Sequence, residues 1–336
     1  MSPKIITIVG ATGFQGRGVL TSFINNPSYQ IRAITRTPSS SSAQSLLSLD
    51  PNITLVKADI TDLLALKLAF SGSNIIFAVT DFLAPMLAHN FDGAKAEGIE
   101  TQQGINLALA AASTLDTLDH YIWSTLPDAS GISGGKNPVP HMDGKASVDA
   151  YIRKSLPELL TKTTFLYVGV YSQAFTYPVL QPYLISTANK YLQFGYWAPD
   201  TPVFIIGNVS KNIGPFVKAA VEQGDKTRNG GVVLAVLPGK EGVIKAEELM
   251  KVWARAKGVE GMYVRVKDWE YKSLWPGWGE EVGSMFELWD LVRERSWTRV
   301  DDEGGKVLTA GDLGLSEGDF EGLEESFRGL VMPWEV

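Results

Sequence analysis

Three glycines with regular spacing lie between the first apolar run of the chain and its first helical pattern. The stretch reads IVGATGFQG, which gives G-x-x-G-x-x-G spacing. Glycine at these positions permits a tight turn, lets the backbone approach a pyrophosphate, and lets the next helix pack close to a sheet. The helix N-terminus then presents free N–H groups and a partial positive charge to the phosphates. We therefore predict a dinucleotide site, with loop contacts from Gly10, Thr12, Gly13, Phe14, Gln15 and Gly16.

The end of the second apolar run indicates which dinucleotide is bound. It reads TRTPSSSS, with an arginine and hydroxyls but no acid. An acid at this point accepts a hydrogen bond from the ribose 2′-OH of NAD, whereas an arginine can pair with a 2′-phosphate. Arg36 therefore favours NADP(H), with NAD(H) as the alternative nucleotide and a solvated surface arginine as the structural alternative. We expect Asp59 and Ile60 beside the adenine, and an N-cap role for Asp59 is compatible with that.

Strand and helix patterns alternate through the first half of the chain and position these residues. We predict strands at 5–10, 29–36, 53–60, 73–80, 119–125, 163–171 and 230–238, and helices at 16–26, 39–50, 61–70, 96–114 and 145–155. Such alternation is typical of βαβ units and predicts an α/β fold with a Rossmann-type, doubly wound parallel sheet.

The second half has a different character. Helical patterns at 245–258, 284–296 and 316–330 predict a smaller, mainly helical C-terminal lobe. We assign residues 1–170 and 203–238 to the NAD(P)-binding domain. Residues 171–202 and 239–336 are assigned to the lobe, which would bind a substrate or a partner.

The composition excludes several kinds of chemistry. The 336 residues include no cysteine, so disulfides, thiolate catalysis and cysteine-ligated metals are ruled out. His89, His120 and His141 are too far apart in sequence to form a short metal motif, and we expect no metal. The chain has a net charge of −7 and no cluster of Lys and Arg, so direct nucleic-acid binding is not expected.

Charge and hydropathy patterns also bear on location. No apolar run approaches the roughly 18–20 residues that span a bilayer, and the N-terminus lacks the pattern of a secretory peptide. We expect no membrane association and a cytoplasmic protein, with the nucleus as an additional location. From Asp301 onward ten residues are acidic and two are basic. This acidic tail predicts a solvated helical face.

Six motifs, in this order, resemble the NmrA-like family, an atypical group within the extended short-chain dehydrogenase/reductase superfamily. They are GATGFQG, AITRT, IIFAVTDF, HYIWSTLPDAS, GKASVDAYIRKS and TTFLYVGVY, and the resemblance is greatest to the fungal branch. It covers residue 4 to about residue 240 and implies a Rossmann domain with a small C-terminal lobe. Within the family some members are negative regulators that read the redox state of nicotinamide nucleotides and bind a GATA-type transcription factor. Related members are NADPH-dependent reductases of quinones, aromatic dyes or phenolic natural products.

The resemblance also implies catalytic candidates. Short-chain reductases place Tyr and Lys at i and i+4 on one helix, and PHMDGKAS has Lys145 at the lysine position and His141 at the tyrosine position. Histidine donates protons near neutral pH, so His141 is a candidate general acid, with local hydrogen bonding in a loop as the alternative. Lys145 is expected to bind the nucleotide. Ser124 stands where the superfamily has its substrate-orienting serine, or it is a strand-end turn hydroxyl.

The ends of the fourth and sixth predicted strands should pass the nicotinamide. We expect cofactor contacts from Val79, Thr80, Phe82, Val168, Gly169 and Tyr171. Tyr171 is a second candidate proton donor, unless it packs as a core aromatic. A group of tryptophans in the C-terminal half belongs to the core or lines an aromatic substrate pocket; its members are Trp269, Trp275, Trp278, Trp289 and Trp297.

Three functions remain open from these residues. The favoured one is an NADPH-dependent reductase of a small aromatic, quinone-like or secondary metabolite. The second is a catalytically silent redox sensor that binds a protein partner, such as a transcription factor, according to the redox state of its nucleotide. The third is a non-redox, aldol-type cyclisation in which Lys145 or His141 acts as acid–base.

Overall fold

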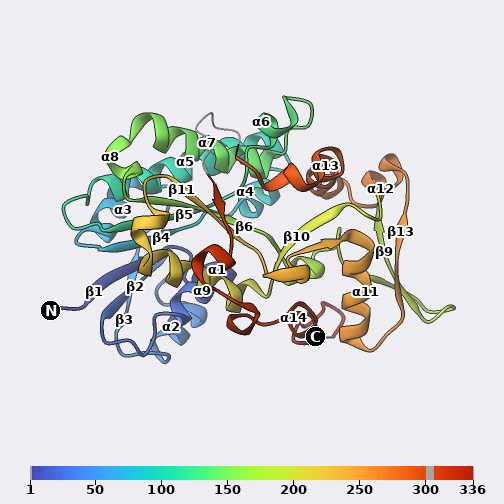
Figure 1. The fold of residues 1–336 in the computed structure, drawn as a ribbon, viewed down its shortest axis with the longest axis horizontal. Coiled ribbons are helices and arrows are strands. Elements are labelled where there is room, and N and C mark those ends of the chain that lie inside the picture. Colours follow the sequence, from blue (N-terminus) through green and yellow to red (C-terminus); the bar gives the residue numbers. More distant parts are fainter. Residues whose placement is uncertain (1, 300–305, 336) are drawn as a thin grey trace.

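Eight parallel strands form the central sheet of the computed structural model, which describes residues 2–299 and 306–335 (Figure 1). Their spatial order is β14-β11-β6-β5-β4-β1-β2-β3. The chain thus adds strands to one side of β1 and then to the other, which is the doubly wound arrangement that the sequence predicted. The strands are β1 (Lys4–Ile8), β2 (Tyr29–Thr35), β3 (Ile53–Lys57), β4 (Ile75–Ala78), β5 (His120–Thr125), β6 (Thr163–Val168), β11 (Gly231–Ala235) and β14 (Val307–Leu308).

Helices cover both faces of this sheet (Figure 1). One face carries α3 (Leu63–Phe70), α5 (Gly93–Ala112), α7 (Pro140–Ser155) and the short α8 (Pro157–Leu160). The other carries α1 (Phe14–Thr21), α2 (Ser41–Leu47) and α9 (Val209–Glu222). Because the sheet is buried on both sides, its central strands are apolar along most of their length. The remaining short helices are α4 (Leu83–Ala88), α6 (Ala129–Ser133) and α10 (Gly224–Thr227).

The C-terminal lobe contains helices and two small sheets, and it lies beyond the carboxyl edge of the large sheet (Figure 1). Its helices are α11 (Ala246–Lys257), α12 (Asp268–Leu274) and α13 (Trp278–Val292). One sheet joins β7 (Val170–Tyr171), β10 (Pro202–Gly207) and β12 (Val243–Lys245), and the other joins β8 (Tyr183–Ile185), β9 (Lys190–Gly195) and β13 (Gly261–Arg265). The sequence predicted helices in this lobe but missed its short strands, which carry little periodicity.

The tail returns from the lobe to the large sheet and then leaves it again. β14 pairs with β11 at one edge of that sheet, although we assigned residues 239–336 to the lobe. The other boundaries between the domain and the lobe remain a prediction. The predicted helix over 316–330 is wrong in extent: α14 covers only Leu323–Arg328. Gly318 and Gly322 precede it, and glycine is a poor helix former. Of the acidic tail residues, those at 301–303 lie outside the described residues.

Helix α7 begins earlier than the sequence predicted. Its first residue is Pro140, a favoured residue at the first helical position, and Val139 precedes it in extended conformation. The Asp143 carboxylate in the first turn accepts hydrogen bonds from the N–H groups of Val139 and Ser130 at 3.0 and 2.9 Å. The earlier start places His141 on the same helix as Lys145, one turn away.

Two glycines let α1 and α9 cross closely beneath the sheet. A Cβ atom at Gly18 would lie 2.7 Å from the Ile213 side chain, and one at Gly214 would lie 2.8 Å from the carbonyl oxygen of Gly18. Helix α9 was not predicted from the sequence, because Gly214 and Pro215 in its interior are both poor helix formers. This crossing fixes α1, the helix that follows the glycine loop, against the rest of the domain.

His120 is buried at the amino end of β5 and should make stability depend on pH. Its Nε2 lies 2.7 Å from the Thr164 hydroxyl oxygen, and that hydroxyl donates to the carbonyl oxygen of Thr227, so Nε2 is the donor to Thr164. Burial, assisted by the charge of Arg228, lowers the pKa of His120 to about 3. In the unfolded chain a histidine takes up a proton near pH 6.5. Protons therefore favour the unfolded state, and stability falls as the pH drops below about 6.5.

We expect this single residue to lower the free energy of unfolding by roughly 2 kcal/mol between pH 7 and pH 5. Urea unfolding at both pH values, compared with a His120→Gln variant whose amide can replace the Nε2 donor, measures the effect. The variant should lose that part of the pH dependence. Equal pH dependence in the two proteins would contradict the assignment.

Among residues 2–299 and 306–335, we find no helix that combines the length and the apolar character needed to cross a membrane.

Candidate functional site

The glycine loop between β1 and α1 has the geometry of a phosphate cradle. Gly10 has a φ of +66°, a conformation that favours glycine, and the Gly13 N–H donates to its carbonyl oxygen at 2.9 Å. A Cβ atom at Gly16 would lie 2.2 Å from that same oxygen, so only glycine fits there. Gly13 is the N-cap of α1 and offers no side-chain acceptor, so the first N–H groups of the helix remain available to an anion. Thr12, Gly13 and Phe14 are exposed around this opening.

Arg36 and Asp59 lie close together at the ends of β2 and β3. Arg36 is exposed. The pKa of Asp59 is lowered chiefly by hydrogen bonds from the Thr61 hydroxyl and N–H, at 2.6 and 2.9 Å, and further by the charge of Arg36. Asp59 thus forms a turn before α3, whose N-cap is Asp62. Ile60 is half-buried beside them. The exposed Arg36 guanidinium can therefore be reached by a phosphate at this edge.

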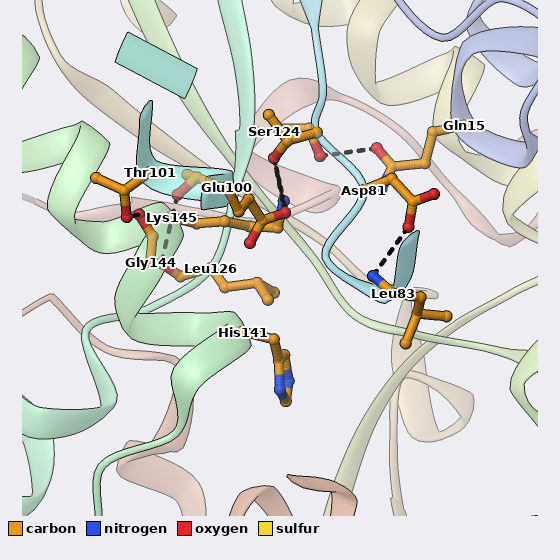
Figure 2. A network of polar contacts seen from close by, with 12 residues as sticks. Gln15, Asp81, Leu83, Glu100, Thr101, Ser124, Leu126, His141, Gly144 and Lys145 are labelled. Atoms are coloured by element: carbon orange, nitrogen blue, oxygen red, sulfur yellow. Dashed lines mark hydrogen bonds and ion pairs between the residues drawn. The ribbon is translucent and has the colours of Figure 1, made fainter. Parts of the chain in front are cut away.

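Lys145 is buried and held by two partners at the carboxyl edge of the sheet (Figure 2). Its Nζ donates to the Thr80 hydroxyl and to Glu100 Oε1, both at 2.7 Å. Thr80 in turn donates to the same Glu100 oxygen at 2.8 Å. Glu100 lies on α5 and is fully buried, and its Oε2 makes no hydrogen bond to any residue that the structure describes. An ammonium group has three donors, so Lys145 retains one for a ligand.

Gln15 of the glycine loop connects Ser124 and Tyr171. Its Oε1 accepts from the Ser124 hydroxyl at 2.7 Å, and its Nε2 donates to the Tyr171 hydroxyl oxygen at 2.5 Å. Burial raises the pKa of Tyr171, and the bond from Gln15 opposes that rise in part. The ends of β5 and β6 are thereby joined to the loop. Because the Gln15 amide donates to Tyr171, the phenolic proton itself remains available to another acceptor.

His141 contacts the C-terminal lobe. Its Nδ1 lies 2.6 Å from Oε1 of Glu281 on α13, and its backbone N–H donates to the same oxygen at 3.1 Å. The imidazole also meets the ring of Phe82 edge-on, with centroids 5.8 Å apart. Figure 2 shows the His141 side chain projecting away from the start of α7. The histidine is therefore helical rather than part of a loop.

An aromatic cluster adjoins this histidine through Phe82. Trp278 at the start of α13 lies 5.6 Å from the ring of Tyr177 and 5.9 Å from that of Phe91, centroid to centroid. Phe91 and Trp278 pack on the cluster that contains Phe82. Of the predicted tryptophan group, Trp289 and Trp297 are core residues, whereas Trp269 is 61% exposed. Only part of that group is therefore near the candidate site.

The remaining predicted cofactor contacts lie just after β4 and at the end of β6. Val79 is half-buried against the glycine loop, with its Cγ1 3.1 Å from the Cβ position of Gly10. Val168 is buried, and a Cβ atom at Gly169 would lie 2.9 Å from the carbonyl oxygen of Phe204. Gly169, between β6 and β7, is thus explained by the close approach of this segment to β10, with which β7 pairs. The residues that sequence reasoning missed are Glu100 and Glu281, whose partners lie 45 and 140 positions away.

The described residues contain no group of three or more His, Asp or Glu side chains arranged to hold a metal ion. The parallel doubly wound sheet, with polar side chains at its carboxyl edge and a glycine loop before α1, defines a Rossmann-type protein of the dinucleotide-binding class. The NmrA-like family profile matches residues 2–308, and the chain belongs to that family.

Relatives of known name include both oxidoreductases and a regulator. The NmrA-like oxidoreductase hkm9 of Aspergillus hancockii is 25% identical over 274 residues, which cover 80% of this chain and 76% of hkm9. The nitrogen metabolite repression protein nmrA of Emericella nidulans is 26% identical over 289 residues, which cover 84% of this chain and 74% of nmrA.

Solved structures with the same fold contain nicotinamide nucleotides. NmrA, a negative transcriptional regulator, has been solved with NAD and with NADP; in both cases the TM-score is 0.73, the identity 22% and the coverage 100% of this chain and 97% of NmrA. The NADPH-dependent quinone oxidoreductase QOR2 of Escherichia coli, solved with NADPH, has a TM-score of 0.63 at 18% identity, covering 96% of this chain and 98% of QOR2. At these identities the likeness establishes the fold.

Proposed function

We propose that this protein is an NADP(H)-dependent reductase of a small aromatic, quinone-like or related secondary metabolite. The observation that carries the proposal is that His141 and Lys145 lie one turn apart on α7, with the Phe82 ring next to the histidine and Trp278 packed on the same apolar cluster. The family includes oxidoreductases, of which hkm9 is one. A proton donor and a flat apolar surface are what reduction of an aromatic carbonyl or quinone requires.

The residues present fit a nicotinamide dinucleotide. The loop from Gly10 to Gly16 would hold the pyrophosphate at the start of α1, and Arg36 would meet the 2′-phosphate. The third N–H of Lys145 would bind the nicotinamide ribose. When bound, the nucleotide supplies the hydride. The chain binds and orients the substrate against it through the rings near Trp278, and supplies the proton.

Replacing Arg36 with Ala is expected to weaken NADPH binding by roughly 10-fold or more, because a charge-assisted pair with the 2′-phosphate is worth about 1.5–3 kcal/mol. NADH binding should stay unchanged, since NADH lacks that phosphate. Arg36→Lys should give an intermediate affinity, because lysine keeps the charge but loses the bidentate geometry. Calorimetric titration with both nucleotides measures the effect. Equal losses for NADPH and NADH would contradict the assigned role of Arg36.

The reductase proposal is tested by NADPH oxidation with a panel of quinones and phenolic ketones. Steady oxidation that depends on both the protein and the substrate would support it. Intact NADPH binding without turnover on any member of the panel would contradict it.

A redox sensor that binds a protein partner is the second candidate, and two observations favour it. Lys145 gives two of its three hydrogen bonds to Glu100 and Thr80, and position 141 lacks the tyrosine of short-chain reductases. A relative with a regulatory name, nmrA, supports the same candidate. A sensor must bind oxidised and reduced nucleotide unequally, because a ligand shifts only states that it binds with different affinity. Titration with NADP⁺ and NADPH tests this, and equal dissociation constants would contradict the sensor.

A further inference from the structure

Glu281 brings a buried carboxylate from the C-terminal lobe to a residue of the nucleotide-binding domain. Its side chain is 7% exposed, and the His141 side chain is 20% exposed. A single oxygen of Glu281, Oε1, lies 2.6 Å from Nδ1 of His141 and accepts a hydrogen bond from the backbone N–H of His141 at 3.1 Å. The double contact fixes the position of the helix start and the rotation of the ring together.

The carboxylate also determines which nitrogen of His141 is free. A carboxylate can only accept hydrogen bonds, so Nδ1 carries a proton. Nε2 lies on the opposite side of the ring from Nδ1 and is therefore the atom that gains or loses the second proton. The edge contact with Phe82 holds the ring in this orientation. His141 is thus prepared to act through Nε2.

Other acidic groups near His141 do not compete with Glu281 for this role. Asp143 is engaged by the N–H groups of Val139 and Ser130 and by the Ser130 hydroxyl. The pKa of Glu97 is raised by burial and by the charges of Asp143 and Glu281, which favours its neutral form. Glu281 itself lies in the first turn of α13, where the helix dipole favours a negative charge.

We propose that Glu281 is a positioning residue that makes His141 the proton donor of the reduction, so that the lobe contributes directly to the chemistry. As the hydride forms the new C–H bond at the substrate carbonyl carbon, the π electron pair of the C=O bond takes the proton from Nε2 and becomes an O–H bond. His141 is left neutral and regains a proton from solvent. This inference rests on the proposed reductase function.

The test compares Glu281→Gln, His141→Ala and the double variant, with Glu280→Gln as a matched control on the adjacent residue of α13. Loss of a general acid lowers kcat by roughly 10²–10⁴-fold, which we expect for His141→Ala. Glu281→Gln should lower kcat by at least about 10-fold with NADPH affinity unchanged, and the double variant should be no slower than His141→Ala, because residues that act as a unit are not additive. Glu280→Gln should keep the wild-type kcat.

A second readout is independent of turnover. The chain has only three histidines, so ¹⁵N spectra, assigned with His89→Gln and His120→Gln, can report the tautomer of each ring. Neutral His141 should carry its proton on Nδ1 in the wild type and shift toward the Nε2–H form in Glu281→Ala. Preserved NADPH binding shows that each variant is folded.

The outcomes separate this inference from the proposed function. A wild-type protein that binds NADPH but reduces no substrate overturns both. A wild-type protein that reduces substrate, together with an undiminished Glu281→Gln or with an additive loss in the double variant, overturns only the role of Glu281. An Nε2–H tautomer of His141 in the wild type also overturns it.

Discussion

A methyl group at position 16 should abolish nucleotide binding. In Gly16→Ala the new Cβ would lie 2.2 Å from the carbonyl oxygen of Gly10 and 2.8 Å from the N–H nitrogen of Ala11, and neither backbone atom can move away without opening the loop. An opened loop no longer directs the N–H groups of α1 at the pyrophosphate. Since each hydrogen bond to a charged group is worth about 1.5–3 kcal/mol, loss of two or more should weaken NADPH binding by more than about 100-fold.

Two other glycines serve as controls for this experiment. A Cβ atom at Gly13 would lie 3.3 Å from the Gly10 oxygen, a contact that a small shift can relieve, so Gly13→Ala should be clearly milder. Gly98 on the exposed side of α5 has nothing within 4 Å of its Cβ position, and Gly98→Ala should bind NADPH normally. Fluorescence titration with NADPH ranks the three variants. Wild-type affinity in folded Gly16→Ala would show that the nucleotide binds elsewhere.

Replacing Lys145 with Met should strongly destabilise the fold. The change removes the cation that neutralises Glu100, and Glu100 is fully buried. A buried pair broken on one side typically costs about 3–5 kcal/mol, because the remaining charge is left unpaired in a medium that solvates it poorly. Chemical denaturation of Lys145→Met should therefore show a loss of that order in the free energy of unfolding.

A second variant separates two causes of the lower stability: the unpaired charge of Glu100 and the lost packing of the Lys145 side chain. Adding Glu100→Gln to Lys145→Met removes the unpaired charge, so the double variant should be more stable than Lys145→Met alone. Lys154→Met, an exposed position on the same helix, should change stability by less than about 0.5 kcal/mol. A Lys145→Met protein as stable as Lys154→Met would mean that the buried pair contributes nothing to stability.

The parts of this molecule that sequence could predict are those encoded locally. The glycine loop and the strand that precedes it lie within a dozen residues and predicted the cradle, and the alternation of short strand and helix patterns predicted the Rossmann-type sheet. Arg36 could be placed at the same edge because the carboxyl ends of parallel strands share one edge. The start of α7 was missed because Pro138, Pro140 and Gly144 read as a loop, although proline is favoured at a first helical position.

The site residues that were missed depend on contacts between distant segments. Glu100 lies in a helical pattern that also contains Glu97, and no local feature marks Glu100 rather than Glu97 as the partner of Lys145. Glu281 meets His141 across the boundary between the domain and the lobe. Gln15 was predicted from its loop position as a cofactor contact, and its bonds to Ser124 and Tyr171 required the ends of β5 and β6 to converge on that loop.

The path of the tail limits how the lobe can move. The chain leaves α13, contributes β14 to the far edge of the large sheet, and then returns to place α14 against α11. Asn212 of α9 adds a further connection, because its side chain donates to the carbonyl oxygen of Glu321 and accepts from that residue's N–H. The tail thus ties the lobe to the large sheet through β14 and to α9 through Asn212. The lobe is therefore held by several contacts with the nucleotide-binding domain rather than by one flexible connection. Rotation of the lobe away from that domain as a hinged lid would have to break these contacts.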